Sequence, residues 1–404
     1  KFDNEGNLIW TRTWGGEYWE AGEDLAIDQS GNIYVAGYFN ETVDFDPGVG
    51  VMEYSSNGDW DSYLVKYDTD GNCLWAKAWG APMWDTALGV AESGGNVYAV
   101  GFFRGGCDFD PGVGSKFLDF VPGASYLTAF DSEGNHLWVK AWAGNGGYDD
   151  LANGVDANAS GSIFVTGVFD GKVDLDPGGG KTEFTAPTVY QDAYLSCFDP
   201  NGDFQWGYGG GEDSDDWGYA VTTGSSGYVF ATGDFAGTVD FDPGAGVDNH
   251  TSVGERDVYC TCFDAGGVFQ WARTWGSASG NWSNGDAGYG VGSDIWGNVL
   301  VTGYFNDSVD FDPGPDVDER VSKGDGDIFV NALDSSGAHQ WTVALGGVAN
   351  DIGKAIASDS EGNTFVTGYF SGIADFNPYD EDYLLSSNGG FDCFMQKILP
   401  FGQW

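Results

Sequence analysis

Short stretches in which apolar and polar residues alternate recur along the whole chain, and turns rich in Gly, Asn and Asp separate them. An alternation of period two, with Val, Ile, Tyr and Phe at the apolar positions, is typical of β-strands that bury one face. The clearest run is Ile33–Phe39, and it returns as NVYAVGFF, SIFVTGVF, YVFATGDF, NVLVTGYF and NTFVTGYF. We therefore predict one such strand in each of six repeats.

Three further strands are predicted in each repeat. The first begins with a small residue and a branched one, as in Ala26-Ile27, and the third has the form of Ser62–Tyr67. The fourth strand carries a Trp in every repeat: Trp10, Trp75, Trp138, Trp206, Trp271 and Trp341. A second Trp follows four residues later at Trp14, Trp79, Trp142 and Trp275, whereas Gly210 and Leu345 occupy this position in the other two repeats. Because residues i and i+4 share one face of a strand, we expect both positions to pack between neighbouring sheets.

The connection between the second and third strands holds the motif by which the repeats are most easily aligned. The stretch YFNETVDFDPG begins at Tyr38, and its first Asp recurs at intervals of 64 to 70 residues as Asp44, Asp108, Asp174, Asp240, Asp310 and Asp375. A fixed period of this size indicates stacked or radially arranged copies of one supersecondary unit.

Four short antiparallel strands per repeat are typical of a β-propeller blade. We predict an all-β fold in which residues 1–404 form a single six-bladed β-propeller. The expected blades are residues 15–79, 80–142, 143–210, 211–275, 276–345 and 346–404 together with 1–14. In the last of these, one N-terminal strand would complete three C-terminal strands, and this closure would remove the free sheet edges.

The segments SGNIYVAGYF, DSYLVKYDTDGN and TVDFDPG resemble the bacterial SBBP repeats, a family named for a seven-bladed β-propeller. The resemblance covers essentially the whole chain and implies the propeller fold, although six copies are present here. It also implies a secreted or surface-attached protein, so we expect an extracellular or cell-surface location. It implies no shared activity.

The charge balance narrows the range of partners. The chain has 15 Lys and Arg against 62 Asp and Glu, a formal net charge of −47. Such a surface repels nucleic acid and favours divalent cations or a basic partner. No run of 18 apolar residues is present, so no transmembrane segment is predicted. The chain opens within a repeat, and we expect upstream residues to have been removed or not to be included in this sequence.

Paired acids in the repeated motif suggest a cation site. Two carboxylates at i and i+2 of an extended segment lie on the same side and repel unless their charge is balanced. Ca²⁺, which prefers carboxylate and backbone oxygens, is the predicted cofactor. The expected ligand pairs are Asp44/Asp46, Asp108/Asp110, Asp174/Asp176, Asp240/Asp242, Asp310/Asp312 and Asp375/Asn377. The alternative is that each Asp only accepts backbone N–H bonds in a turn before the Pro.

A second set of acids and aromatic residues precedes the first strand of each repeat. An aromatic ring beside a carboxylate is a common arrangement for holding a sugar. The candidate ligand residues are Trp19, Glu20, Trp84, Asp85, Tyr148, Asp150, Asp216, Trp217, Trp282, Asp286 and Asp351. The alternative here is loop packing with structural hydrogen bonds from each Asp.

Signals for catalysis are few, because the chain has only three His and no metal-binding cluster of Cys or His. We therefore predict a non-enzymatic recognition or structural module whose partner is a glycan or another surface protein. A multivalent carbohydrate-binding propeller is the first alternative. A polysaccharide-degrading enzyme is the second, and near-identical copies of one acid argue against it, since catalysis needs two acids in different environments.

Overall fold

The structure is a computed structural model, and it describes residues 1–112, 114–187, 190–211, 214–278, 285–377, 379 and 383–403. Apart from the 3-10 helix Pro400–Gly402, every regular element in these residues is a β-strand. The predicted all-β class is confirmed. None of the described residues belongs to a helix of the length and hydropathy needed to cross a bilayer.

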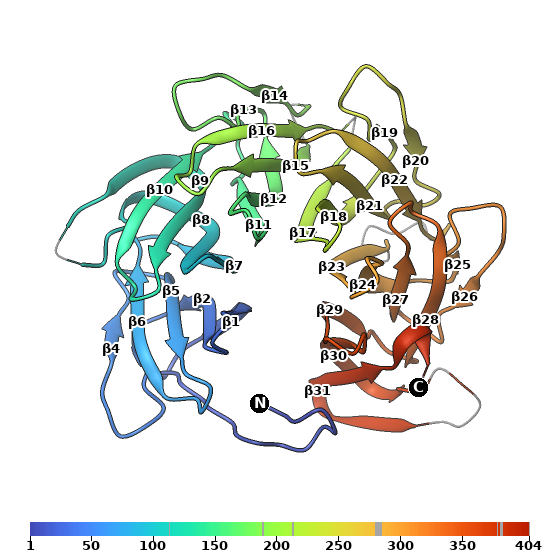
Figure 1. Ribbon diagram of the computed structural model, residues 1–404, viewed down its shortest axis with the longest axis horizontal. Helices are drawn as coiled ribbons and strands as arrows, with labels where there is room; N and C mark the ends of the chain where they lie inside the picture. The colour runs from blue at the N-terminus through green and yellow to red at the C-terminus, as the bar shows by residue number, and fades with distance from the viewer. Residues whose placement is uncertain are drawn as a thin grey trace. The chain divides into compact units, whose positions relative to one another are not determined.

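The strands form antiparallel sheets in which the four strands of a repeat are neighbours in chain order (Figure 1). The first repeat supplies β1 (Glu20–Ile27), β2 (Ile33–Phe39), β5 (Asp61–Tyr67) and β6 (Cys73–Trp79). The second supplies β7 (Thr86–Ser93), β8 (Asn96–Asp108), β9 (Phe117–Asp131) and β10 (His136–Trp142). The third supplies β11 (Leu151–Ala157), β12 (Ile163–Asp170), β15 (Gln191–Phe198) and β16 (Phe204–Gly209). The fourth supplies β17 (Trp217–Thr223), β18 (Tyr228–Phe235), β21 (Asp257–Asp264) and β22 (Phe269–Trp275).

The remaining strands belong to one larger sheet. Its fifth-repeat strands are β23 (Ala287–Ser293), β24 (Val299–Phe305), β27 (Asp327–Leu333) and β28 (His339–Gly347). Its sixth-repeat strands are β29 (Ile352–Ser358), β30 (Thr364–Asp375) and β31 (Leu384–Ile398), and β28 joins β30 through the pairs Gly346↔Asp375 and Gly347↔Ala374. The three C-terminal strands are thus formed as predicted. Residues 1–14, all of them described, contain no sheet strand and only the isolated bridge Phe2↔Leu8, so closure by this segment stays a prediction.

The connection that carries the repeated motif is itself a small hairpin. It is a separate two-stranded sheet in four repeats: β3 (Thr42–Asp44) with β4 (Glu53–Ser55), β13 (Lys172–Asp174) with β14 (Glu183–Thr185), β19 (Thr238–Asp240) with β20 (Asn249–Thr251), and β25 (Ser308–Asp310) with β26 (Glu319–Val321). In the second and sixth repeats the same pairing continues from the long strands β8/β9 and β30/β31. The V-D-F-D alternation explains this hairpin, because Val43 and Phe45 are fully buried between the acids.

The conserved first Trp of the fourth strand joins each repeat to the next. Its indole N–H donates to a carbonyl in the turn between the third and fourth strands one repeat further on: Trp10 to Thr69, Trp75 to Ser132, Trp138 to Pro200, Trp206 to Ala265 and Trp271 to Ser335, at 3.0–3.1 Å. The ring also covers the Gly of that turn, such as Gly134 under Trp75. The predicted packing of this Trp between neighbouring sheets is confirmed.

By its contacts the chain divides into two compact units. The first comprises Lys1–Val165, Phe169–Thr185 and Ser196–Gln205, and the second comprises Thr166–Val168, Ala186–Leu195 and Trp206–Trp404. The core of the first unit includes Tyr34, Trp79 and Phe130, and that of the second includes Phe230, Trp275 and Phe329. Each core is therefore built from facing sheets of successive repeats.

Candidate functional site

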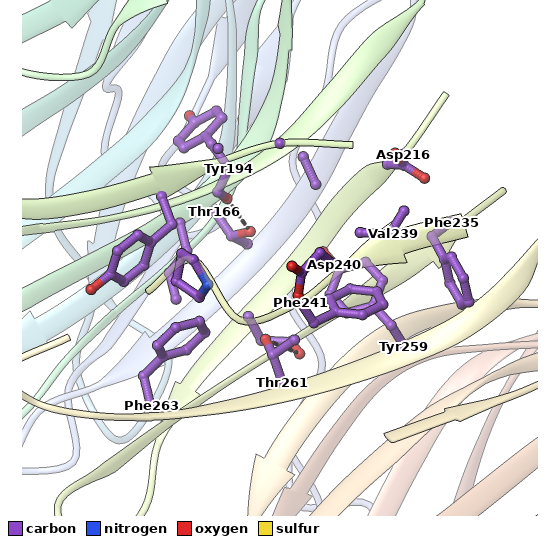
Figure 2. A pocket seen from close by; sticks show the side chains of 17 residues that line it. Thr166, Tyr194, Asp216, Phe235, Val239, Asp240, Phe241, Tyr259, Thr261 and Phe263 are labelled. Carbon is purple, nitrogen blue, oxygen red and sulfur yellow. Dashed lines mark hydrogen bonds between the residues drawn. The ribbon is translucent and has the colours of Figure 1, made fainter. Parts of the chain in front are cut away.

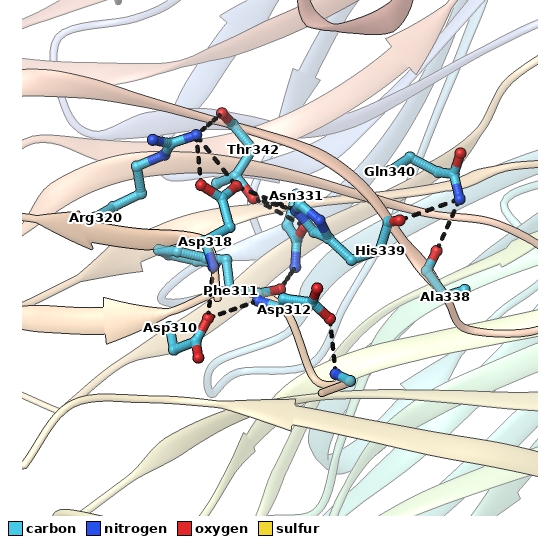
Figure 3. Close-up of polar contacts among 11 residues, drawn as sticks. Asp310, Phe311, Asp312, Asp318, Arg320, Asn331, Ala338, His339, Gln340 and Thr342 are labelled. Carbon is cyan, nitrogen blue, oxygen red and sulfur yellow. Dashed lines mark hydrogen bonds and ion pairs between the residues drawn. The ribbon is translucent and has the colours of Figure 1, made fainter. Parts of the chain in front are cut away.

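The paired acids of the repeated motif bond to their own loop. In the fifth repeat, Asp310 Oδ1 accepts N–H bonds from Asp312 at 3.1 Å and from Asp318 at 2.9 Å, and Asp312 Oδ1 accepts the N–H of Gly314 at 2.7 Å (Figure 3). These bonds fix the chain on both sides of the turn. The backbone arrangement is the one expected of a turn-forming Asp before Pro.

The same three bonds recur in the other repeats. Asp44, Asp108, Asp174, Asp240 and Asp375 each accept the N–H groups of residues i+2 and i+8. Asp46, Asp110, Asp176, Asp242 and Asn377 each accept the N–H of residue i+2. Lys323 also pairs with Asp375 at 2.9 Å. Backbone donors thus balance part of the charge for which the sequence suggested a cation.

Among the described residues, no group of three or more His, Cys, Asp or Glu is arranged to hold a metal ion. Five of these loops have two carboxylates and the sixth has Asp375 with Asn377, so a cation there would need backbone oxygens or water for its other ligands. The calcium site stays a prediction.

The acids that precede the first strand are buried rather than exposed. Asp85, Asp150, Asp216, Asp286 and Asp351 are at most 2% exposed. In the fifth repeat, Asp286 Oδ2 accepts the N–H of Ser277 at 2.6 Å, and its Oδ1 accepts the N–H of Asn306 at 2.7 Å. Asp85, Asp150 and Asp351 bind two backbone N–H groups in the same manner, while Glu20 accepts the N–H of Gly16 in the first repeat. Each acid clamps the incoming chain to the end of the second strand.

A third set of acids begins the third strand and was missed by the sequence reasoning. Asp61, Asp257 and Asp327 are at most 4% exposed, and Oδ2 of each accepts one backbone N–H. Their Oδ1 atoms have no hydrogen-bond partner among the described residues. The sequence did contain a signal for this set, because an Asp stands just before the third strand in every repeat except the second, where Ala124 replaces it.

Members of the two buried sets lie close together. A Cβ atom on Gly346 would lie 2.6 Å from Asp327 Oδ1 and 3.0 Å from Asp351 Oδ2. Burial raises the pKa of Asp327 to about 7 and that of Asp351 to about 6, and the charge of Asp351 adds to the shift of Asp327. Burial likewise raises the pKa of Asp61 and of Asp85 to about 7, with the Asp61 charge contributing at Asp85. Each pair therefore retains a proton near neutral pH.

The aromatic members of the predicted sugar site differ from the acids in their exposure. Trp84 is 53% exposed and stacks on Trp60 at 5.2 Å, and Trp60 stacks on Tyr38 at 4.9 Å. Trp19 and Tyr148 are also exposed, whereas Trp217 packs against Tyr219. Trp282 lies outside the described residues. A ligand can reach the rings, while the neighbouring Asp side chains point into the protein.

Comparison with known proteins gives only distant likenesses. No protein-family model matches the chain. It is 24% identical over 219 residues, 46% of its length, to an uncharacterized WD repeat-containing protein, L264, of Acanthamoeba polyphaga mimivirus. It is 31% identical over 146 residues, 36% of its length, to the regulatory protein FlaEY of Caulobacter vibrioides. The matched part spans 15% of each of these proteins. The fold defines an all-β repeat protein, and these likenesses assign it to no family.

Proposed function

We propose that the chain is a six-bladed β-propeller that acts outside the cell as a non-enzymatic recognition module and binds glycans through exposed aromatic rings. The four-stranded antiparallel sheets of the first four repeats support the propeller, as does the likeness to a WD repeat-containing protein. Close approach of successive first strands supports it as well, because a Cβ on Gly290 would lie 2.8 Å from the Lys354 carbonyl oxygen. Innermost strands of a propeller converge in this way.

The stack of Tyr38, Trp60 and Trp84 carries the glycan proposal. Its outer ring is half exposed although a Trp gains from burial, and a flat, accessible indole is suited to covering the apolar face of a sugar. The excess of 62 acidic over 15 basic residues in the chain favours a neutral or cationic glycan over an acidic one. The acids of the chain recur in near-identical surroundings, so the polysaccharide-degrading alternative gains no support.

Replacement of Trp84 by Ala is expected to weaken glycan binding about tenfold, equivalent to about 1.4 kcal/mol, because the stacking surface is lost. A glycan array would identify the ligand, and calorimetry would then compare the variants. Trp296→Ala is the matched control, since Trp296 is 48% exposed but lies in a turn between first and second strands. Equal binding by both variants, or no binding by the wild type, would remove the glycan from the proposal.

The proposed module also retains the predicted calcium sites in its hairpin loops. Binding would use the carboxylate pairs of which Asp44 and Asp46 are the first, and it would offset repulsion in a chain of net charge −47. We expect the melting temperature to rise by several degrees on adding millimolar Ca²⁺ to chelator-treated protein. Mg²⁺ at the same concentration controls for screening. Superimposed Ca²⁺ and chelator curves would contradict calcium binding.

A further inference from the structure

A cavity of about 140 Å³ lies in the second unit beside the end of β16. The aromatic side chains that line it include Tyr208, Phe241, Tyr259 and Phe263. Figure 2 shows Asp216 at the edge of this group. A cavity of about 150 Å³ with apolar walls is large enough for one small aromatic ring.

The cavity occupies the place of a side chain that other repeats have. In the first repeat, Trp79 contacts Phe130 at 5.5 Å and Tyr126 at 6.2 Å, both in the following repeat. In the second repeat, Trp142 stacks on Phe198 at 5.5 Å. The third repeat has Gly210 at this position. Its aromatic counterparts in the following repeat are Phe263 and Tyr259, and both line the cavity.

The backbone conformation at position 210 does not require a glycine. A Cβ atom added there would meet nothing within 4 Å, and its φ is not in the left-handed region. The Gly210 N–H still donates to the Ala193 carbonyl at 3.2 Å, so the strand pairing is maintained. By contrast, Leu345 fills the same position of the fifth repeat and is 1% exposed. The third repeat is therefore the one that leaves this space open.

Contacts of the aromatic side chains with one another hold them at the walls of the cavity. Tyr208 stacks on Phe263 at 5.2 Å with an interplanar angle of 19°, and its hydroxyl donates to the Gly267 carbonyl. The tyrosine is thus held against one wall rather than folded across the gap. The rings of Phe241 and Tyr259 contact each other at 5.3 Å on another wall.

One buried acid, Asp216, lines the edge of this cavity. Asp216 is 2% exposed, and its Oδ1 accepts the N–H of Ala236 at 2.9 Å. Its Oδ2 has no hydrogen-bond partner among the described residues. A Cβ atom on Gly211 would overlap this oxygen and lie 2.8 Å from Asp192 Oδ1, so the oxygen lies beside a second carboxylate.

We propose that this cavity binds a planar aromatic molecule about the size of indole, held between the rings beside the Asp216 carboxylate at the cavity's edge. Aromatic rings are the largest side chains of the lining, although Thr166, Asp240 and Thr261 also line it. Ring faces favour an aromatic molecule, which stacks on them, over a sugar. The site is separate from the Trp84 stack. Its failure would therefore leave the glycan proposal untouched, and the reverse also holds.

Titration of the whole chain with 5-fluoroindole, followed by fluorine NMR, tests the proposal. The wild type is expected to bind with a Kd of about 1 mM or tighter, which is usual for so small a ligand. Gly210→Trp should abolish binding and raise the melting temperature, because the indole then fills the cavity from within. Gly179→Trp, an exposed glycine with nothing within 4 Å of its Cβ position, is the control and should bind as the wild type does.

Gly210→Leu provides a second, smaller filling in case the Trp variant folds poorly, and it should weaken binding at least fivefold. Absence of binding to the wild type at 10-fold the expected Kd would overturn the proposal. Undiminished binding by a folded Gly210 variant would do the same, because the ligand would then occupy another site.

Discussion

Replacement of Gly303 by Ala is expected to lower the free energy of unfolding by about 3 kcal/mol or more, at the upper end for an overpacked core. Gly303 lies in β24 opposite Gly288 of β23, where the register shifts between Gly288 and Gly290. This β-bulge brings the neighbouring strand so close that a Cβ on Gly303 would overlap the Ala287 carbonyl oxygen. The collision involves backbone on both sides, so no rotamer change can relieve it.

Urea unfolding followed by tryptophan fluorescence would measure the loss. Gly210→Ala is the matched control, because the same methyl group there meets nothing within 4 Å, and its effect should stay within about 0.5 kcal/mol. Equal urea midpoints for Gly303→Ala and Gly210→Ala would contradict the prediction, because the backbone at the bulge would then have moved to accommodate the added methyl group. The same contact recurs at Gly37, Gly101, Gly233 and Gly368, so an Ala at any of these positions should lower the free energy of unfolding by a similar amount.

The β-bulge also illustrates which features of the fold could be predicted from the sequence and which could not. Alternation located Ile33–Phe39 as β2 and gave the correct order of the first and third strands around it. The prediction that the first strand begins at Ala26-Ile27 was wrong, because β1 begins at Glu20 and ends at Ile27. The recurring Gly of VTG was visible in that pattern, but its reason was not. A bulge depends on the register between two strands, and register is a property of the pair that neither strand specifies alone.

The candidate site was harder to predict than the strands. Residue type located the acids, but the direction of each side chain depends on donors that are distant in sequence, as Arg104 is from Asp85. The sequence therefore grouped the acid Asp85 with its exposed neighbour Trp84, although the two face opposite environments. The V-D-F-D motif was predicted to be extended, but its pairing into a hairpin was not predicted, because the period-two signal is only four residues long. The cavity at Gly210 needed the three-dimensional positions of Phe263 and Tyr259.

The protein is expected to be more stable near pH 5 than at pH 8, with a melting temperature higher by at least about 5 °C. Burial raises the pKa of Asp286 and of Asp150 to about 7, and that of Asp257 to about 6, as it does for the buried pairs described above. An acid whose pKa is raised on folding favours the folded state in its protonated form. Its contribution is complete below the unfolded pKa of 3.8 and is lost as the pH rises through 6 to 7.

A different set of acids causes the folded state to lose stability at acidic pH. In the turns between the third and fourth strands, the side-chain hydrogen bond from Asn72 lowers the pKa of Asp68. An acid of this kind stabilises the folded state when charged, and its contribution is lost as the pH falls below 3.8. The two sets together predict a maximum between about pH 4 and pH 6. A melting temperature that rises steadily from pH 5 to pH 8 would contradict the assignment of the buried acids.

The variant Asp327→Asn separates this effect from the general repulsion of a highly acidic chain. Its amide would place a donor where Asp327 Oδ1 now has no partner, facing Asp351 Oδ2 across Gly346, while the carbonyl keeps the N–H of Lys323. We expect the variant to gain stability at pH 8 relative to the wild type and to be unchanged or weaker at pH 5. Asp316→Asn removes one charge from an exposed loop position and should change the stability by the same amount at pH 5 and at pH 8. If both variants changed the pH profile equally, total charge rather than the buried pair would govern it, because Asp327 is buried beside a second carboxylate whereas Asp316 is exposed.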